Sequence, residues 1–328
     1  MILLLQLLVM LGTAMLCGYI ARRLTLPAVI GELFGGILLG PTVLNLFHPT
    51  AAIAIVAKIG VISFLFVAGL EVSLHDVRRN ARAVVATSLG GILLPFAAAQ
   101  LAVRLVPSLW KQSLNVDQLA LFMGAALAIS ALPVIARIIF DLGYERLPLA
   151  SIVLASATID DLLGWALFAI VTSARVPWTV FTPCVFAAGA LLSRRLEKSE
   201  RVRQIAIRLL APLFFVSLGL GVDFVKSFDW RLVISVNVIA FVRKIAGATL
   251  GARVAGVALR QAAAIGMAMN ARGAVEMVLA SVALEAKLID ARLFVALVVM
   301  AVVTSAIAGP SMRLMLRERS VTPLENVP

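Results

Sequence analysis

Two adjacent carboxylates, Asp160 and Asp161, stand in the middle of an apolar run that extends from Leu147 to Ser173. At 1.5 Å per residue this run forms a helix of about 40 Å, which is long enough to span a bilayer with some tilt. An ionisable residue near the bilayer centre costs roughly 2.5–3.5 kcal/mol on insertion scales, and such residues usually mark an ion or proton pathway. The pair therefore predicts ion or proton binding. A satisfied structural ion pair and a soluble helix cap are the alternatives.

Two further charged residues, Arg243 and Lys244, lie inside another apolar run, the predicted helix 230–256. A lysine at mid-membrane depth needs a carboxylate partner, and Asp160 is the expected one. The alternative is that one or both cations extend along the helix to the membrane interface. Lys244 is near the middle of its helix, which makes that extension harder for Lys244 than for Arg243.

The predicted helix 117–140 is interrupted by Ser130-Ala131-Leu132-Pro133 and carries Arg137 in the next turn. Pro133 has no backbone N–H to donate, and it disfavours the helical conformation at Leu132. A break in this helix is therefore expected. The alternative is a proline kink whose backbone groups are satisfied by neighbouring helices.

The predicted helix 260–286 has a corresponding interruption, Asn270-Ala271-Arg272-Gly273, followed by Glu276. Asn270 and Gly273 are weak helix formers in an apolar segment. Interruptions at corresponding places in two halves of a chain are typical of broken helices that face an ion site. We expect Arg137 and Glu276 to pair where the two helices cross, because each charge offsets the cost of burying the other.

The composition places the whole chain in a membrane. Of its 328 residues, 62% are hydrophobic and 14% are charged, whereas soluble domains are about 45–50% apolar and about 25% charged. The net charge of +12 does not indicate a nucleic-acid partner, because the basic residues lie at the ends of the apolar blocks. We expect an all-α polytopic membrane protein whose partner is the lipid bilayer, with no nucleic acid bound.

The apolar blocks and their breaks predict about eleven transmembrane helices, at residues 2–21, 27–46, 51–73, 82–106, 117–140, 147–173, 177–194, 203–222, 230–256, 260–286 and 290–315. Lysine and arginine are more frequent in the connections that follow odd-numbered helices. Because cytoplasmic loops carry an excess of these residues, the N-terminus is expected outside and the C-terminus in the cytoplasm.

Two segments of similar sequence, 64–74 (FLFVAGLEVSL) and 214–224 (FFVSLGLGVDF), end the third and eighth predicted helices. An odd offset of five helices inverts the second copy in the membrane, which is the pattern of inverted repeats in secondary transporters. The chain is thus expected to form one transmembrane domain over 1–316. Its first repeat covers about 1–173, its second about 177–316, and residues 317–328 form a short tail.

These features resemble the monovalent cation:proton antiporters of the second cation–proton antiporter family, which includes bacterial sodium/proton antiporters, Kef-type potassium efflux systems and plant cation/proton exchangers. The resemblance rests on seven segments in family order, at residues 26–44, 64–74, 126–139, 155–165, 211–224, 243–253 and 262–280. Each segment alone is a loose match, but the ordered set is specific and spans most of the chain.

The resemblance implies a core of two crossing broken helices that moves against a dimerising scaffold in a bacterial inner membrane. It assigns Asp161 as the carboxylate that binds the cation and the proton, and Asp160 as the partner of Lys244. Hard oxygen ligands suit Na⁺ or K⁺, so Ser130, Thr158 and freed backbone carbonyls are candidate further ligands. We expect a homodimeric transporter that exchanges sodium or potassium for protons, with no cofactor and no enzymatic activity.

Three departures from the family pattern leave other functions open. The chain has about eleven predicted helices where relatives have twelve or thirteen, and Ala131 stands where relatives often have threonine. No glycine-rich regulatory domain follows the last predicted helix, unlike in full Kef-type systems. The alternatives are an inactive or sensor-like protein derived from an antiporter, or the membrane part of a potassium efflux system. An intramembrane aspartyl protease is disfavoured, because adjacent aspartates point about 100° apart on a helix.

Replacing the assigned carboxylate provides a direct test. Asp161→Asn should abolish exchange and leave the fold intact, because an amide of the same shape neither carries the charge nor takes up the proton. The measurement is cation-induced dequenching of a pH dye in proteoliposomes under a pH gradient. Exchange by folded Asp161→Asn protein would contradict the assignment.

Overall fold

The structure of the chain is a computed structural model that describes residues 2–24, 28–70, 80–110, 115–144, 146–172, 184–185, 188, 204 and 206–316. The main helices of this part are α1 (Ile2–Arg23), α2 (Ala28–Leu39), α3 (Ala51–Leu70), α5 (Ala81–Leu105), α6 (Pro107–Trp110), α7 (Val116–Ala128), α8 (Leu132–Asp141), α9 (Pro148–Thr172), the π-helical turn η2 (Ala206–Leu210), α12 (Ala211–Leu220), α13 (Trp230–Val254), α14 (Leu259–Met269), α15 (Ala274–Glu285) and α16 (Ala291–Leu316).

Within the described part, five helices (α1, α5, α9, α13 and α16) are long and apolar enough to cross a membrane. The prediction of a helix over 27–46 was wrong in its extent, because α2 ends at Leu39. Pro41 disfavours a helical Gly40, and the chain then turns through Asn45, whose φ is 51°. The predicted helix 177–194 lies mostly outside the described residues, so the total of eleven stays a prediction.

Both predicted interruptions are breaks in the backbone. The segment 117–140 forms two helices, and α7 ends where Ile129 adopts an extended conformation (ψ 143°). The segment 260–286 likewise forms α14 and α15, separated at residues 270–273. The two breaks meet, because the backbone N–H of Ala131 donates to the carbonyl oxygen of Ala271 at 3.0 Å. The chain therefore contains two broken helices that cross.

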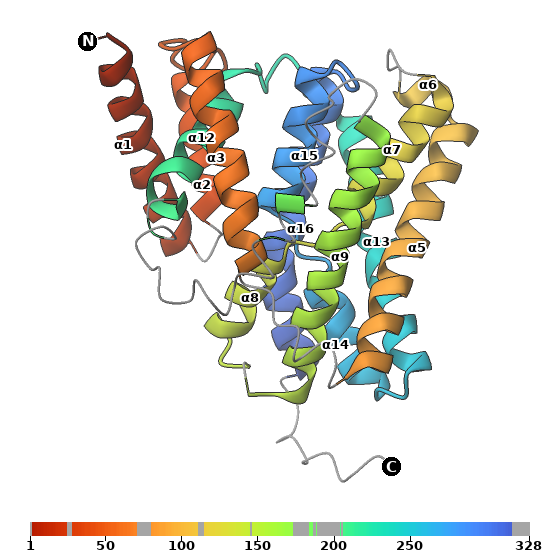
Figure 1. The fold of residues 1–328 in the computed structure, drawn as a ribbon. Helices are drawn as coiled ribbons and strands as arrows, with labels where there is room; N and C mark the ends of the chain where they lie inside the picture. Colours follow the sequence, from red (N-terminus) through yellow and green to blue (C-terminus); the bar gives the residue numbers. More distant parts are fainter. Residues whose placement is uncertain are drawn as a thin grey trace.

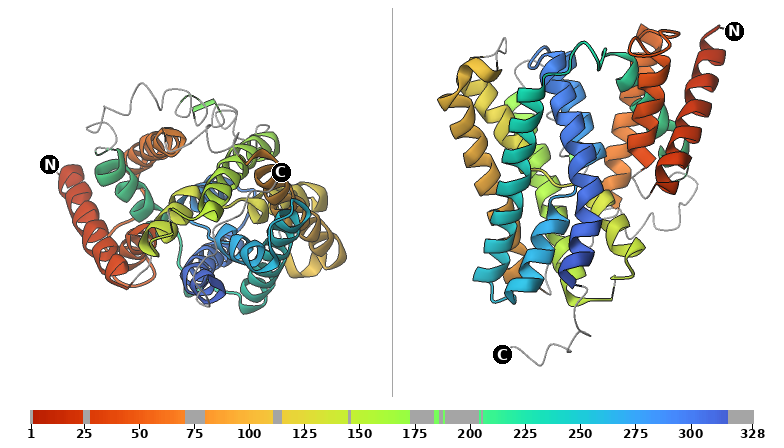
Figure 2. Two further views of the ribbon diagram at one scale, coloured as in Figure 1. Left: turned by 90° about the horizontal axis from the view of Figure 1, so that it is seen from below. Right: turned by 180° about the vertical axis from the view of Figure 1, so that it is seen from behind.

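The helices form two groups that stand side by side (Figures 1 and 2). The lateral group consists of α1, α2, α3, η2 and α12, and the crossing group consists of α5 to α9 and α13 to α16. The extensive helix–helix contacts all lie within one group or the other. Between the groups, apolar side chains such as Leu33, Phe215 and Leu218 join the buried cluster of the crossing helices. Apolar contacts are non-directional, so these side chains do not hold the two groups in one particular orientation.

Equivalent helices of the two halves run in opposite directions (Figures 1 and 2). The equivalent elements are α3 and α12, α5 and α13, α7–α8 and α14–α15, and α9 and α16. This arrangement is the inverted repeat that the two similar segments predict. It brings the break of each half to the same depth, where the two cross.

Glycine permits the closest crossing in the lateral group. A Cβ atom at Gly36 of α2 would overlap the carbonyl oxygen of Val216 in α12, and Gly219 faces Gly36 from the opposite side. Gly90 of α5 and Gly247 of α13 meet in the same way in the crossing group. Small residues let helix backbones approach in lipid, where van der Waals contact drives association.

Gly36→Ala is expected to lower thermal stability in detergent, because forcing a methyl group into a filled contact costs about 1–3 kcal/mol. Gly12→Ala in α1 is the matched control, since no atom lies within 4 Å of its new Cβ. That control should be neutral or stabilising, because alanine is the better helix former. Equal melting temperatures for the two variants would contradict this account of the α2–α12 crossing.

Candidate functional site

The carboxylate of Asp160 is the centre of the buried polar network at the crossing. Its Oδ1 accepts a hydrogen bond from Ser88 Oγ of α5 at 2.6 Å. Its Oδ2 accepts from Ser130 Oγ, in the first break, at 2.9 Å, and from Lys244 Nζ of α13 at 2.5 Å. The side chains of Asp160 and Lys244 are both fully buried. The structure thus brings together the two residues that the sequence predicts as partners, so Lys244 does not extend to the membrane interface.

Lys244 also holds the end of a broken helix. Its Nζ donates to the carbonyl oxygen of Ala128, the last residue of α7, at 2.5 Å. Gly91 lies beside it, with the position of an ideal Cβ 3.5 Å from Lys244 Nζ. One ammonium group therefore links a carboxylate of α9 to the C-terminal end of α7, where the helix dipole is negative.

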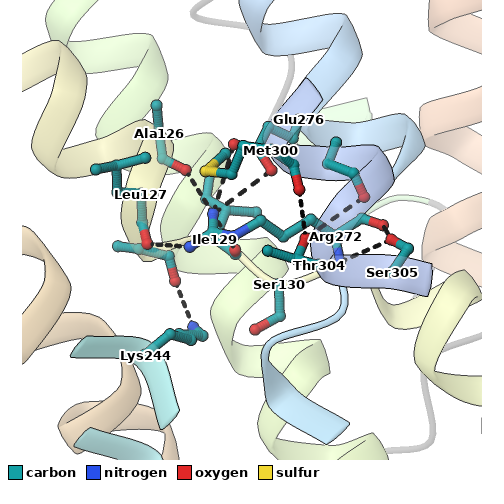
Figure 3. Close-up of polar contacts among 12 residues, drawn as sticks. Ala126, Leu127, Ile129, Ser130, Lys244, Arg272, Glu276, Met300, Thr304 and Ser305 are labelled. Atoms are coloured by element: carbon teal, nitrogen blue, oxygen red, sulfur yellow. Dashed lines mark hydrogen bonds and ion pairs between the residues drawn. The ribbon is translucent and has the colours of Figure 1, made fainter. Parts of the chain in front are cut away.

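Arg272, in the second break, occupies the remaining carbonyls of the same helix end (Figure 3). Its Nη1 donates to the oxygens of Ala126 and Ile129 at 3.0 and 3.1 Å, and its Nη2 donates to Leu127 at 2.5 Å. The carbonyl groups of residues 126–129 thus already accept hydrogen bonds from two protein cations, and the binding of the transported cation by freed carbonyls stays a prediction.

Glu276 lies next to Arg272 rather than at a separate place in the crossing. Both of its carboxylate oxygens are 3.5 Å from Arg272 Nη1. The side chain of Arg137 is outside the described part of the structure, so the predicted pairing of Arg137 with Glu276 stays a prediction. In the described residues the cation beside Glu276 is Arg272, one turn earlier in the chain.

The backbone of the second break is anchored by α16. Ser305 Oγ donates to the carbonyl oxygen of Arg272 and lies 3.3 Å from its backbone N–H. The preceding residue, Thr304, donates to Met300 within its own helix at 2.8 Å. The hydroxyl group of Ser305, in the second repeat, thus holds one break, whereas the carboxylate of Asp160, in the first repeat, contacts the other.

The remaining candidate ligand atoms are side-chain oxygens of Asp161, Thr158 and Asn270, which lie near the residues of this network in the sequence. Asp161 is fully buried beside Asp160 on α9. Thr158 Oγ1 donates its hydrogen to Leu154 O at 3.0 Å, which leaves the lone pairs of the hydroxyl oxygen for a cation. The buried amide of Asn270 has no hydrogen-bond partner among the described residues. Hard oxygen atoms of this kind suit a small monovalent cation.

Pro133 and Gly273 shape the breaks and contribute no polar side-chain atom. Pro133 is the second residue of α8, where the missing N–H costs no helical hydrogen bond. A Cβ atom at Gly273 would collide with Val134 of α8, so glycine allows the start of α15 to approach the other broken helix.

Sequence reasoning missed the two serines that complete the network, Ser88 and Ser305. Ser88 is buried and directly precedes Leu89-Gly90-Gly91, where α5 lies closest to α13. A hydroxyl residue beside a glycine pair in an apolar helix was the available signal. Serine is common in membrane helices and often bonds only its own backbone, which is why the signal carries little information alone.

The family described as "Sodium/hydrogen exchanger, transmembrane" matches residues 11–183 and 184–318. The chain belongs to this family. The antiporter resemblance of the sequence is thereby confirmed.

Relatives and a solved structure agree with the family match. The chain is 26% identical to the Na(+)/H(+) antiporter NhaS4 of Synechocystis, with 94% of this chain and 96% of that protein covered. It is also 26% identical to the Na(+)/H(+)-K(+) antiporter GerN of Bacillus cereus, at 94% and 95% coverage. The solved sodium proton antiporter MjNhaP1 of Methanocaldococcus jannaschii has the same fold, with a TM-score of 0.69 at 14% identity over 95% of this chain and 97% of that one.

The alignment with NhaS4 extends over 393 residues, more than the 328 of this chain. The relative therefore contains inserted residues that this chain lacks. This difference agrees with the expectation that the chain has fewer transmembrane helices than its relatives.

Removal of the Ser88 hydroxyl should lower the stability of the protein more than removal of the Ser156 hydroxyl. Ser156 Oγ donates to Val84 O at 3.1 Å across the same α5–α9 contact. A hydrogen bond to a charged group is worth about 1.5–3 kcal/mol, against about 0.5–1.5 kcal/mol for a neutral one. Ser88→Ala should thus lose more thermal stability, and more exchange activity, than Ser156→Ala. Equal losses in the two variants would show that Ser88 contributes only helix packing.

Proposed function

We propose that the protein is a secondary active transporter that exchanges a monovalent cation for protons across a membrane by alternating access. Family membership supports this activity, and the charge balance at the crossing supports its mechanism. Among the described residues, three buried carboxylates (Asp160, Asp161 and Glu276) lie with two buried cations (Lys244 and Arg272). With all ionised, three negative and two positive charges leave these five groups at a net charge of −1, which either a metal cation or a proton can neutralise.

Asp161 is the group we assign to this exchange. The resemblance to the antiporter family assigns this role to Asp161, which is fully buried beside Asp160 on α9. Burial in a low dielectric makes an uncompensated charge costly, so a proton and a cation compete for the same carboxylate. Protonation of Asp161 releases the cation on one side of the membrane, and cation binding releases the proton on the other.

The transported cation is sodium or potassium in this proposal. NhaS4 is named a sodium/proton antiporter, and GerN a sodium/proton–potassium antiporter. Asp161, together with hydroxyl oxygens from Ser130 or Thr158, provides hard ligands for either ion. The single hydrogen of the Ser130 hydroxyl is engaged by Asp160 Oδ2 (2.9 Å) or by the carbonyl oxygen of Met269 (2.8 Å), which leaves the lone pairs of its oxygen available.

The finer features of the proposal follow from charge placement and from the family. Residues 1–316 form one transporter domain of two repeats, with 317–328 as a cytoplasmic tail. The protein is placed in the inner membrane of a bacterium as a homodimer with its N-terminus outside, and it has no enzymatic activity. The opposite positions of the start of α1 and the end of α16 are compatible with this orientation (Figure 1).

A second candidate is an inactive or sensor-like protein derived from an antiporter, or the membrane part of a potassium efflux system. The residues that NhaS4 has and this chain lacks favour this candidate. The retained Asp160, Asp161 and Lys244 favour transport, because burying a second carboxylate beside the first is costly and a protein without transport activity has no need of it.

The decisive test uses purified protein in proteoliposomes with an imposed pH gradient and a lumenal pH dye. Na⁺, K⁺ and Li⁺ are added in turn, with Asp161→Asn as the inactive control. Dequenching by one cation, absent in the control, is the expected result, and it names the ion. No response to any cation from demonstrably folded protein would favour the inactive or sensor function instead.

A further inference from the structure

The connection between α12 and α13, residues 221–229, is the described link between the lateral group and the crossing group. It runs across the end of the bundle where α1 begins (Figures 1 and 2). Its latter part is a compact turn, in which Ser227 N donates to Asp223 O at 3.0 Å and Lys226 N donates to Asp223 Oδ1 at 3.1 Å. If this turn opens, the chain can extend by about 3.3 Å per residue. The covalent connection therefore does not fix the two groups relative to each other.

The first part of the connection is tied to the lateral group by a single hydroxyl. Thr42, in the turn after α2, donates to the carbonyl oxygen of Val222 at 3.2 Å. Thr42 Oγ1 in turn accepts a hydrogen bond from the backbone N–H of Phe224 at 3.0 Å. Two segments that carry the family resemblance, 26–44 and 211–224, thus meet at this point.

The side chain of Phe224 contacts the other group. Its ring packs edge-to-face on Phe294 of α16, with ring centroids 6.1 Å apart and planes inclined at 65°. Phe294 is buried in the core of the crossing helices, and Phe224 is partly buried against that core. One residue is therefore held to the lateral group through its backbone and to the crossing group through its ring.

We propose that Thr42, Phe224 and Phe294 form a latch that stabilises the conformation seen in this structure. The inference rests on the proposed function, because alternating access requires the crossing group to move relative to the lateral group. Any such displacement at this end of the bundle must break either the two Thr42 hydrogen bonds or the ring contact. The ring contact is the weaker and less directional of the two, so it is the one that opens and closes in each cycle.

The test measures the conformational equilibrium directly. Spin labels are placed at Val43 and Val116, two exposed positions in the lateral and crossing groups. Cys17 and Cys184 are first replaced by alanine, and distance distributions are recorded by double electron–electron resonance in lipid. Phe224→Ala removes the ring contact, and Thr42→Val removes the hydroxyl at nearly constant volume. Phe228→Ala is the matched control, since Phe228 lies in the same connection with 54% of its surface exposed.

Phe224→Ala and Thr42→Val should each reduce the population of the observed distance relative to the alternative by about two- to tenfold. Thr42→Ser keeps the hydroxyl group, so it should show the wild-type ratio of the two populations. Phe228→Ala should show that ratio as well. The latch is refuted if Phe224→Ala matches Phe228→Ala, or if all variants keep a single distance. Exchange by the wild-type protein is measured in parallel: activity without a change in the distance distributions overturns the latch alone, whereas absence of activity overturns the proposed function.

Discussion

The structure depends on one requirement, namely that the carbonyl groups at the interrupted end of α7 find donors inside a membrane. No water is available there, and each unsatisfied backbone group costs several kcal/mol. Lys244 and Arg272 meet the requirement with four hydrogen bonds to residues 126–129. Because these donors are charged, carboxylates must accompany them. The positions of Asp160 on α9 and Glu276 on α15 follow from that need.

The same requirement explains how distant parts of the chain are joined. Lys244 belongs to α13 and Arg272 to the second break, yet both bind the end of a helix in the first repeat. Ser88 and Ser130 then bring α5 and the first break to the same carboxylate. The crossing helices are thus linked by directional polar contacts, whereas apolar side chains form much of their boundary with the lateral group. A displacement along that boundary would leave the polar network of the crossing helices intact.

The sequence was most informative at residues that are costly to bury in a membrane or that interrupt a helix. A charged residue in an apolar run needs a partner, so the ion pair of Asp160 and Lys244 was predictable. Proline or glycine inside a helical run indicates an interruption, so the breaks at Pro133 and Gly273 were predictable too. The role of Arg272 was not, because its partners are backbone carbonyls more than 140 residues earlier, which leave no trace in side-chain patterns. The early end of α2 was missed for a different reason: Val43, Leu44 and Leu46 continue the apolar run beyond Leu39, although Gly40 and Pro41 turn the chain. Ser88 was missed because a single hydroxyl costs too little to stand out.

The two repeats share their backbone architecture but not their chemistry. Asp160 and Asp161 are the thirteenth and fourteenth residues of α9, and Thr304 and Ser305 are the fourteenth and fifteenth of α16. Had an ancestral duplication kept acids in both halves, two more negative charges would lie beside the same two cations, and the molecule would bind ions at two equivalent places. Neutral hydroxyls in α16 break that equivalence. The second half supplies the architectural counterpart of the first, while the pair of buried aspartates belongs to the first half alone.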